Sequence, residues 1–481
     1  MTKKLFCSLC LLICCFTAFG VHSKAAAAPT LASEAACVMD ADTGEVLFQK
    51  HAGRSLRPAS ITKQMTALLV LEHVAAGDGS LDDKVKVTSE ALSTVNLEST
   101  RIGFEVGQKR TVRDLMYCML VYSANDAANI LAEYVAGDVD TFVDQMNKRA
   151  EELGCTNTHF DNPNGLDPDD DGDHHTCARD MARISLALEA VPDYFDFAGS
   201  MKYGLDTDKV IKESWEIWTK VDMLRTDSPY YNKEAIAGKT GWTSKAHHTF
   251  VVYMTRGDRN LIIVTMNSIA PGDKYEDAVK LMDYCCDSFQ DVTLTPGDYQ
   301  SAAERSIQQG GLDISLDTSN LPELDLLLPS GITADNLRYK VSKQDGDYAE
   351  LTVGIAEDSW QAYQAVTHIQ GDKARLLTVA IPVKNSPMKN LFSTDSSTGS
   401  GSAVGLGFSD SSAQTRILLT IVAAALVLLS ILFLIFHTVR RRKAAKQAAE
   451  HKPLQIVIKT PEQYLTEEEQ QEQSGSSDQS K

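Results

Sequence analysis

The sequence predicts a large mixed α/β (α+β) first domain, a small all-β second domain and a single transmembrane helix near the C-terminus. Three observations support this fold class. Apolar, β-branched runs lie near both ends of residues 29–291 and enclose a middle with helical spacing. Short β-like runs separated by turns follow in residues 292–387. An uncharged apolar run, Ile417 to Phe436, then has the length that spans a bilayer.

Length and composition describe a globular, acidic protein. The chain has 481 residues, of which 43% are hydrophobic and 23% are charged, so it can build a sizeable core. Its formal net charge is −19, and the globular part has no basic stripe. Nucleic acid is therefore not expected as a partner.

The N-terminal residues 1–28 have the pattern of a signal peptide. Lys3 and Lys4 give a cationic start, Leu5 to Gly20 is apolar, and Ala25 to Ala28 supply small residues for cleavage. This pattern predicts that the chain is exported.

The first domain, residues 29–291, is expected to begin and end with strands. Ala36–Asp40 and Val46–Gln49 flank a turn and predict a β-hairpin, and so do His248–Thr255 and Leu261–Asn267. Helices are expected after Ser60 and over residues 127–135, 141–153, 179–188 and 275–289.

Residues 292–387 are predicted to form the small all-β domain, with β-like runs at Leu321–Leu328, Tyr348–Ile355 and Arg375–Val383. Six cysteines in the predicted exterior part lack a C-x-x-C framework. They are expected to be mostly buried free thiols, namely Cys37, Cys118, Cys155, Cys177, Cys285 and Cys286.

The remaining residues predict a membrane anchor. A Ser/Gly-rich linker (388–415) precedes the transmembrane helix (416–439), and a polar cytoplasmic tail (440–481) follows it. Arg440 to Lys443 come directly after the apolar run, and positive charge marks the cytoplasmic side. We therefore expect a single-pass protein of the cell membrane whose globular part faces outward.

Ser60 and Lys63 are the candidate nucleophile and base. Their spacing places both side chains on one face of a helix, one turn apart. Helix-forming residues follow without Gly or Pro until Gly77, so Ser60 should lie at a helix N-terminus, where free N–H groups favour negative charge. A serine attacks only when a base takes its proton, and a lysine with a lowered pKa is such a base. The same residues also fit a plain helix start with a solvated lysine.

Two further motifs follow Ser60-Ile61-Thr62-Lys63 in order, Ser123-Ala124-Asn125 and Lys239-Thr240-Gly241. They fall in an expected inter-helix loop and at an expected strand start. Each motif is weak alone, but the ordered set is a known signature of class A β-lactamases and penicillin-binding proteins.

The chain resembles the serine-type D-alanyl-D-alanine carboxypeptidases, the low-molecular-mass penicillin-binding proteins. The resemblance covers about residues 30–290 and implies a penicillin-binding-protein/β-lactamase-like catalytic domain. It rests on the trio and on further stretches that look like family signatures, which are Met39–Gly44, Pro58-Ala59-Ser60, Asn125-Asp126-Ala127, Asn162–Leu166 and Ala178–Ala182.

The resemblance implies roles for the motif residues in acyl transfer. Ser60 would attack the carbonyl of the penultimate D-Ala and form an acyl-enzyme, and Lys63 would take its proton. Ser123 would relay a proton to the leaving D-Ala. Asn125 would bond the substrate's amide and help to hold Lys63.

The third motif would bind the substrate. Lys239 would meet its terminal carboxylate, with Thr240 and Gly241 beside it, and the backbone N–H groups of Ser60 and Trp242 would form the oxyanion hole. Lys220 or Arg225 could supply a further cation, and the sequence does not decide between them. No cofactor or metal is implied.

The implied substrates are peptidoglycan stem peptides that end in D-Ala-D-Ala, and β-lactams would be covalent inhibitors. A β-lactamase is the alternative enzyme, but residues between Asn125 and Lys239 contain no Glu-x-x-Leu-Asn deacylation motif. A non-catalytic β-lactam-binding sensor or scaffold is the other alternative, against which the intact motifs argue.

The acidic loop from Asp167 to His175 has only a partial resemblance to metal sites. Asp167, Asp169 and Asp171 partly match a calcium loop, but Ala178 stands where that loop needs a glutamate. His174, His175 and Cys177 suggest zinc only weakly. A solvated loop at the rim of the site is the favoured prediction.

Overall fold

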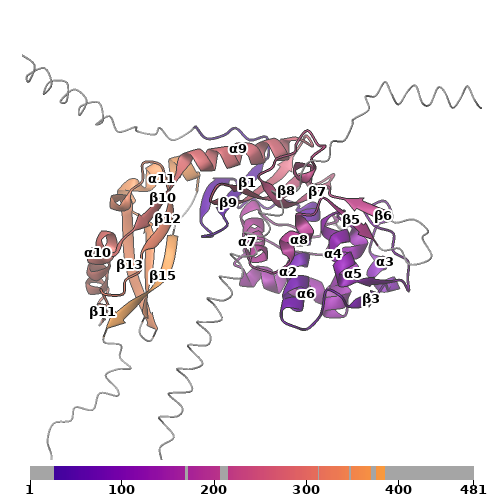
Figure 1. The fold of residues 1–481 in the computed structure, drawn as a ribbon, viewed down its shortest axis with the longest axis horizontal. Coiled ribbons are helices and arrows are strands. Elements are labelled where there is room, and N and C mark those ends of the chain that lie inside the picture. The colour runs from indigo at the N-terminus through magenta and orange to yellow at the C-terminus, as the bar shows by residue number, and fades with distance from the viewer. Residues whose placement is uncertain are drawn as a thin grey trace, which may run out of the picture. The chain divides into compact units, whose positions relative to one another are not determined.

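The computed structural model describes residues 27–167, 172–205, 215–312, 314–345, 348–369 and 375–384 (Figure 1). All of them belong to one compact unit, Met1–Thr394. Most of the predicted signal peptide lies outside these residues, as do the predicted linker, the predicted transmembrane helix (416–439) and the predicted tail. Within the described residues, no helix combines the length and apolarity needed to cross a bilayer.

A five-stranded antiparallel sheet is the framework of the first domain, with strand order β2-β1-β9-β8-β7 (Figure 1). The N-terminal hairpin thus pairs with the strands that end the domain. Both predicted hairpins are confirmed, and β7 lies at an edge of the sheet. The strands are β1 (Ala35–Asp40), β2 (Val46–Lys50), β7 (Ala235–Thr243), β8 (His247–Arg256) and β9 (Arg259–Ser268).

The sheet is covered on both faces, which explains its nearly continuous apolar strands. Along β8, Val251 and Tyr253 join the core beneath the helical layer, whereas Phe250 and Val252 join the core beneath α9 (Asp273–Ser288). This alternation follows from the two-residue period of a strand.

The helical layer packs on the face opposite α9. Helix α7 contacts β1 and β9, and α2 contacts α5 and α7. The predicted helices are confirmed. The layer consists of η1 (Ala59–Thr62), α2 (Lys63–Ala75), α3 (Ser89–Ser93), α4 (Val112–Leu120), α5 (Asn125–Ala136), α6 (Val139–Glu152), α7 (Ala178–Glu189) and α8 (Tyr194–Ala198).

Smaller elements complete the first domain. Two short antiparallel pairs flank the helices, and one turn of 3-10 helix precedes β7. These elements are β3 (Lys84–Lys86) with β4 (Lys109–Thr111), β5 (Lys202–Leu205) with β6 (Trp215–Trp218), and η2 (Asp222–Leu224).

The second domain is not all-β, so that prediction is wrong. The predicted strands are present, but two helices accompany them. Its elements are β10 (Phe289–Leu294), α10 (Pro296–Gln309), β11 (Ser315–Leu316), β12 (Leu324–Pro329), η3 (Ala334–Asn336), β13 (Leu337–Asp345), β14 (Tyr348–Ile355), η4 (Glu357–Ser359), α11 (Trp360–Thr367) and β15 (Arg375–Lys384). Strands β11-β15-β14-β13 form one sheet and β10-β12 another.

Local chemistry explains helix α10. Thr295 and Asp298 form a capping box around Pro296 at the first helical position, a strong start signal. Tyr299, Ala303 and Ile307 are buried in the second domain's core, spaced four residues apart. This narrow stripe is set among polar residues, and it is easily missed beside the β-rich runs around it.

Candidate active site

Ser60 lies in the 3-10 turn η1, which leads directly into α2, rather than at the first position of the α-helix itself. The preceding Ala59 has φ 51°, a left-handed conformation that is unfavourable for alanine. Two hydroxyl groups hold this backbone. Thr62 Oγ1 donates to the Ala59 carbonyl at 2.9 Å, and Thr249 Oγ1, from β8, donates to the Pro58 carbonyl at 2.7 Å. The nucleophile's position is therefore fixed by both layers of the domain.

Lys63 is completely buried and has three oxygen partners. Its Nζ lies 2.9 Å from Ser60 Oγ, 2.6 Å from Asn125 Oδ1 and 2.5 Å from the Asn164 carbonyl oxygen. Asn125 Oδ1 and the Asn164 carbonyl oxygen can only accept hydrogen bonds, so each requires an N–H donor. A neutral amine has two N–H groups and one lone pair. It can satisfy both acceptors and still receive the Ser60 proton.

The electrostatic environment of Lys63 favours that neutral form. Burial lowers the pKa of Lys63 well below its usual range, and the nearby positive charge of Lys239 lowers it further. The negative charge of Asp126 raises the pKa of Lys63. The Asp126 carboxylate also accepts hydrogen bonds from the backbone N–H groups of residues 102–104.

Ser123 lies between α4 and α5 in a strained conformation, with φ 69°. Its Oγ accepts a hydrogen bond from Lys239 Nζ at 2.8 Å. Asn125 begins α5 two residues later, which turns its side chain toward Lys63. A strained serine held by two helices and a strand is a feature common at functional sites.

Lys239 lies on the edge strand β7 and is 1% exposed. Its Nζ also donates to the Thr240 carbonyl oxygen at 2.6 Å. Burial lowers the pKa of Lys239 to about 7, and the positive charge of Lys220 contributes to this shift. Burial thus opposes the positive charge of Lys239, which a bound anion would favour.

Gly241 brings β7 against the nucleophile. A Cβ atom at this position would lie 2.7 Å from the Ser60 backbone nitrogen and 2.4 Å from Thr249 Oγ1, so only glycine fits. The neighbouring Thr240 Oγ1 lies 3.3 Å from the Lys220 carbonyl oxygen, and the Trp242 side chain is 61% exposed. An edge strand also offers backbone groups to an extended peptide.

The two candidate extra cations differ in their surroundings. Lys220 Nζ lies over the Tyr122 ring, 4.5 Å from its centroid, and its charge acts on Lys239. Arg225 instead forms a two-pronged ion pair with Asp227. Lys220 is therefore the cation that the fold brings to Lys239.

The Asn162–Leu166 turn contributes to the site through its backbone, which the sequence analysis did not assign. The Asn164 carbonyl binds Lys63, and the Asn164 amide group donates to Asn129 Oδ1 at 2.9 Å. Gly165 has φ 88°, and a Cβ there would lie 1.9 Å from the Ala59 carbonyl oxygen. The turn chemistry was visible in the sequence, but its contact with Ala59 depends on tertiary structure.

His174 corrects the prediction of a solvated rim loop, because its side chain is fully buried. Its Nδ1 accepts from the Asp161 N–H at 2.9 Å, and its Nε2 lies 3.1 Å from Thr62 Oγ1. Burial lowers the pKa of His174 to about 3, so the ring stays neutral and donates from Nε2. Residues 168–171 lie outside the described part, within which no group of three His, Cys, Asp or Glu side chains is placed to hold a metal ion.

The chain is similar in sequence to known proteins. The family model described as D-alanyl-D-alanine carboxypeptidase matches residues 22–270, about half of the chain. The D-alanyl-D-alanine carboxypeptidase DacF of Bacillus subtilis is 28% identical over 67% of this chain and 79% of its own length. DacC of Escherichia coli, another D-alanyl-D-alanine carboxypeptidase, is 31% identical over 60% of this chain and 70% of its own.

The fold of the chain is also similar to that of solved structures. Penicillin binding protein 6B of Escherichia coli matches with a TM-score of 0.54 at 23% identity, covering 74% of this chain and 97% of the other. The carboxypeptidase DacD of Francisella tularensis matches with a TM-score of 0.53 at 20% identity, covering 75% of this chain and 94% of the other. At these identities the likeness establishes the architecture.

Proposed function

The chain belongs to the peptidase S11 family and is a serine-type D-alanyl-D-alanine carboxypeptidase, and from this premise we propose that it trims peptidoglycan stem pentapeptides through an acyl-enzyme on Ser60. The observation that carries the mechanism is the set of partners around Lys63 Nζ, two carbonyl acceptors and the Ser60 hydroxyl. A terminal D-Ala-D-Ala amide is unreactive, so it requires a nucleophile, a base and an oxyanion site.

In acylation, Ser60 Oγ attacks the carbonyl carbon of the penultimate D-Ala while neutral Lys63 takes its proton. The negative charge that develops on the carbonyl oxygen is stabilised by the backbone N–H groups of Ser60 and Trp242. Gly241 supports this role, because its lack of a side chain lets β7 approach the Ser60 nitrogen. Such donors contribute about 3 kcal/mol each to transition-state stabilisation in comparable enzymes.

Departure of the terminal D-Ala needs a proton on its amine. Ser123 is the proposed relay: the proton that Lys63 took from Ser60 passes through the Ser123 hydroxyl to the amine, which returns Lys63 to its neutral form. Lys239 donates a hydrogen bond to Ser123 Oγ. The C–N bond breaks as the amine is protonated, which leaves Ser60 esterified. Water then hydrolyses the ester, and Lys63 in its neutral form activates that water.

Substrate recognition depends on positive charge beside strand β7. The terminal carboxylate meets Lys239 and restores its full positive charge, since an opposite charge raises the pKa of an ammonium group. Thr240 and Gly241 line the same strand, Asn125 binds the substrate's amide, and Lys220 adds positive potential. β-Lactams carry a carboxylate and a strained amide, so they acylate Ser60 in the same way.

We further propose that the protein acts outside the cytoplasm while anchored to the cell membrane. The signal-peptide pattern of residues 1–28 and the apolar segment Ile417–Phe436, followed by Arg440 to Lys443, support this location. Peptidoglycan is then accessible to the catalytic domain from the outer face of the membrane.

The decisive experiment measures D-Ala release from a stem pentapeptide by the purified chain and by Ser60→Ala. We expect turnover by the wild type and none by Ser60→Ala, with the exposed Ser93→Ala as a matched control. A β-lactamase would instead turn over benzylpenicillin without releasing D-Ala. A non-catalytic sensor would bind benzylpenicillin and release nothing. Either of those results would overturn the proposal.

A further inference from the structure

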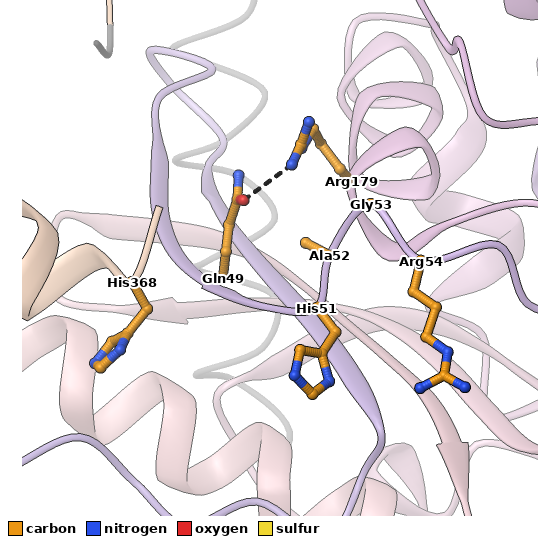
Figure 2. A pocket seen from close by; sticks show the side chains of 7 residues that line it. All are labelled: Gln49, His51, Ala52, Gly53, Arg54, Arg179 and His368. Carbon is orange, nitrogen blue, oxygen red and sulfur yellow. Dashed lines mark hydrogen bonds between the residues drawn. The ribbon is translucent and has the colours of Figure 1, made fainter. Parts of the chain in front are cut away.

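A second polar site lies at the opposite edge of the five-stranded sheet from β7. It is a cavity of about 340 Å³ beside β2, the strand at the far end of the order β2-β1-β9-β8-β7. Figure 2 shows its lining, which comes from the end of β2 and the following loop, from α7 and from the end of α11. The residues are Gln49, His51, Ala52, Gly53, Arg54, Arg179 and His368.

The lining is rich in groups that bind anions. Two arginines and two histidines contribute to it, in a protein whose net charge is −19. Glu34 forms an ion pair with Arg54 and offsets one positive charge, and its backbone carbonyl lies 3.1 Å from His51 Nδ1. Lys50 turns away from the cavity, because its Nζ donates to the carbonyls of Leu31 and Ser33. The charge of Arg179 is left without a carboxylate partner among the ion pairs of the described residues.

Two buried nitrogen atoms in this lining have no hydrogen-bond partner within the described part of the chain. They are Arg179 Nε and His368 Nε2. Arg179 Nη2 donates to Gln49 Oε1 at 3.1 Å, as Figure 2 shows, which fixes one prong of the guanidinium and leaves Nε unpaired. Buried polar groups are nearly always paired in folded proteins, so both side chains bordering the cavity retain unused hydrogen-bonding capacity.

Both unpaired groups are held in place by the fold. Arg179 is the second residue of α7, and its backbone N–H donates to the Ala52 carbonyl at 2.9 Å. His368 ends α11 in a left-handed conformation with φ 56°, and its ring lies 5.2 Å from the ring of Phe48 on β2. A ligand would therefore meet side chains that are already ordered, which lowers the entropic cost of binding.

We propose that this cavity is a binding site for a small anion that carries carboxylate or phosphate groups. Arg179 supplies the primary contact through its guanidinium group, because a guanidinium matches the planar oxygens of such groups. Arg54, His51 and His368 line the same cavity. Since His368 belongs to the second domain and the other groups to the first, the bound anion contacts both domains and stabilises the unit.

The test is calorimetric titration of the purified full-length chain with inorganic phosphate and, separately, with citrate. We expect saturable binding of at least one, and the tighter of the two identifies the preferred group. Arg179→Gln should weaken it by about tenfold or more, because a charge-assisted contact is lost. Arg54→Gln should weaken it less, since that side chain is 59% exposed and already paired. Circular dichroism of each variant checks that it is folded.

Two controls separate this site from the catalytic one and from general charge. Lys239→Gln removes the proposed anion site of the active centre, and binding should persist in that variant. Arg113→Gln removes an exposed arginine that pairs with Asp82, and binding should again be unchanged. The proposal is wrong if neither anion binds saturably, if folded Arg179→Gln and Arg54→Gln both bind like the wild type, or if Lys239→Gln abolishes binding.

Discussion

The active site has a helical side, formed by η1, α2 and α5, and a strand side, formed by β7. Each side contributes one buried lysine, and the two lysines have different surroundings. Lys63, on the helical side, has all its partners within the protein, which are Ser60, Asn125 and Asn164. Lys239, on the strand side, has Ser123 and its neighbour's carbonyl. In the proposed mechanism the same residue type serves as a base where burial and a neighbouring positive charge favour the neutral amine, and as an anion receptor where a charge is left for the substrate.

The largest effect is expected from Lys63→Arg. A guanidinium cannot give up a proton at accessible pH, so the base is lost. Acylation by benzylpenicillin should fall by about 10²- to 10⁴-fold, the usual contribution of a general base. Stopped-flow or quenched acylation kinetics measure it, and the exposed Lys86→Arg is the control. Equal acylation rates in Lys63→Arg and wild type would remove Lys63 from the role of base.

A second substitution tests whether the helical side depends on the Asn162–Leu166 turn. Gly165→Ala places a methyl group 1.9 Å from the Ala59 carbonyl and requires φ 88° of an alanine. We expect a loss of about 2 kcal/mol or more in unfolding free energy, measured by urea denaturation, together with slower acylation.

Gly77→Ala is its matched control. Gly77 has φ 84°, but a Cβ there meets nothing within 4 Å. It therefore carries the same conformational penalty without the clash. If both variants lose equal stability and acylate equally well, the contact between Gly165 and Ala59 does not position Ser60.

Lys239→Arg should have a smaller effect than either change, because it keeps the positive charge and alters only its shape. We expect about a tenfold loss in acylation rate at neutral pH, as for other geometric mismatches between lysine and arginine. Lys239→Met removes the charge and should lose more. If Lys239→Arg is less active than Lys63→Arg, the two roles assigned here are reversed.

The smallest expected effect is on how the free energy of unfolding changes with pH. Burial depresses the pKa of Lys239 to about 7 in the folded protein, whereas the unfolded chain has the ordinary value of 10.5. Between these values the unfolded state binds more protons, so unfolding free energy rises with pH across that window. Lys63 acts in the same direction. Urea denaturation at about pH 7 and about pH 9.5 should show a smaller rise for Lys239→Met than for wild type. An equal rise would show that Lys239 titrates normally.

Sequence patterns identify the side chains that come together at the candidate site but not what surrounds them. Ser60, Lys63, Ser123 and Lys239 lie in short motifs, and the structure brings all four together. The contribution of Asn164 is a backbone carbonyl, which any residue carries, so no side-chain pattern marks it. The sequence does not indicate the burial of His174, because its neighbours in the chain are acidic and polar. Its hydrogen-bond partners, Thr62 and Asp161, are not adjacent to it in the sequence.

The second domain shows the same limit at the level of the fold. Its strands were predicted from apolar, β-branched runs, which report secondary structure locally. Helix α11 was missed because Trp360–Thr367 is short, and its aromatic residues also favour strands. The burial of Tyr363 against the first domain, where its hydroxyl lies 3.2 Å from Glu45 Oε1, depends on contacts between residues 318 positions apart. Local patterns contain no information about such contacts.

In the proposed mechanism Lys63 works as a neutral amine and Lys239 as a charged one, and the pH profile of acylation tests these charge states most directly. The wild-type rate with benzylpenicillin should rise as Lys63 loses its proton and fall as Lys239, with its pKa of about 7, loses its charge. In Lys239→Arg the charge persists, so the fall on the alkaline side should disappear while the rise remains. An alkaline fall that is unchanged in Lys239→Arg would contradict the assignment of two charge states to the two lysines.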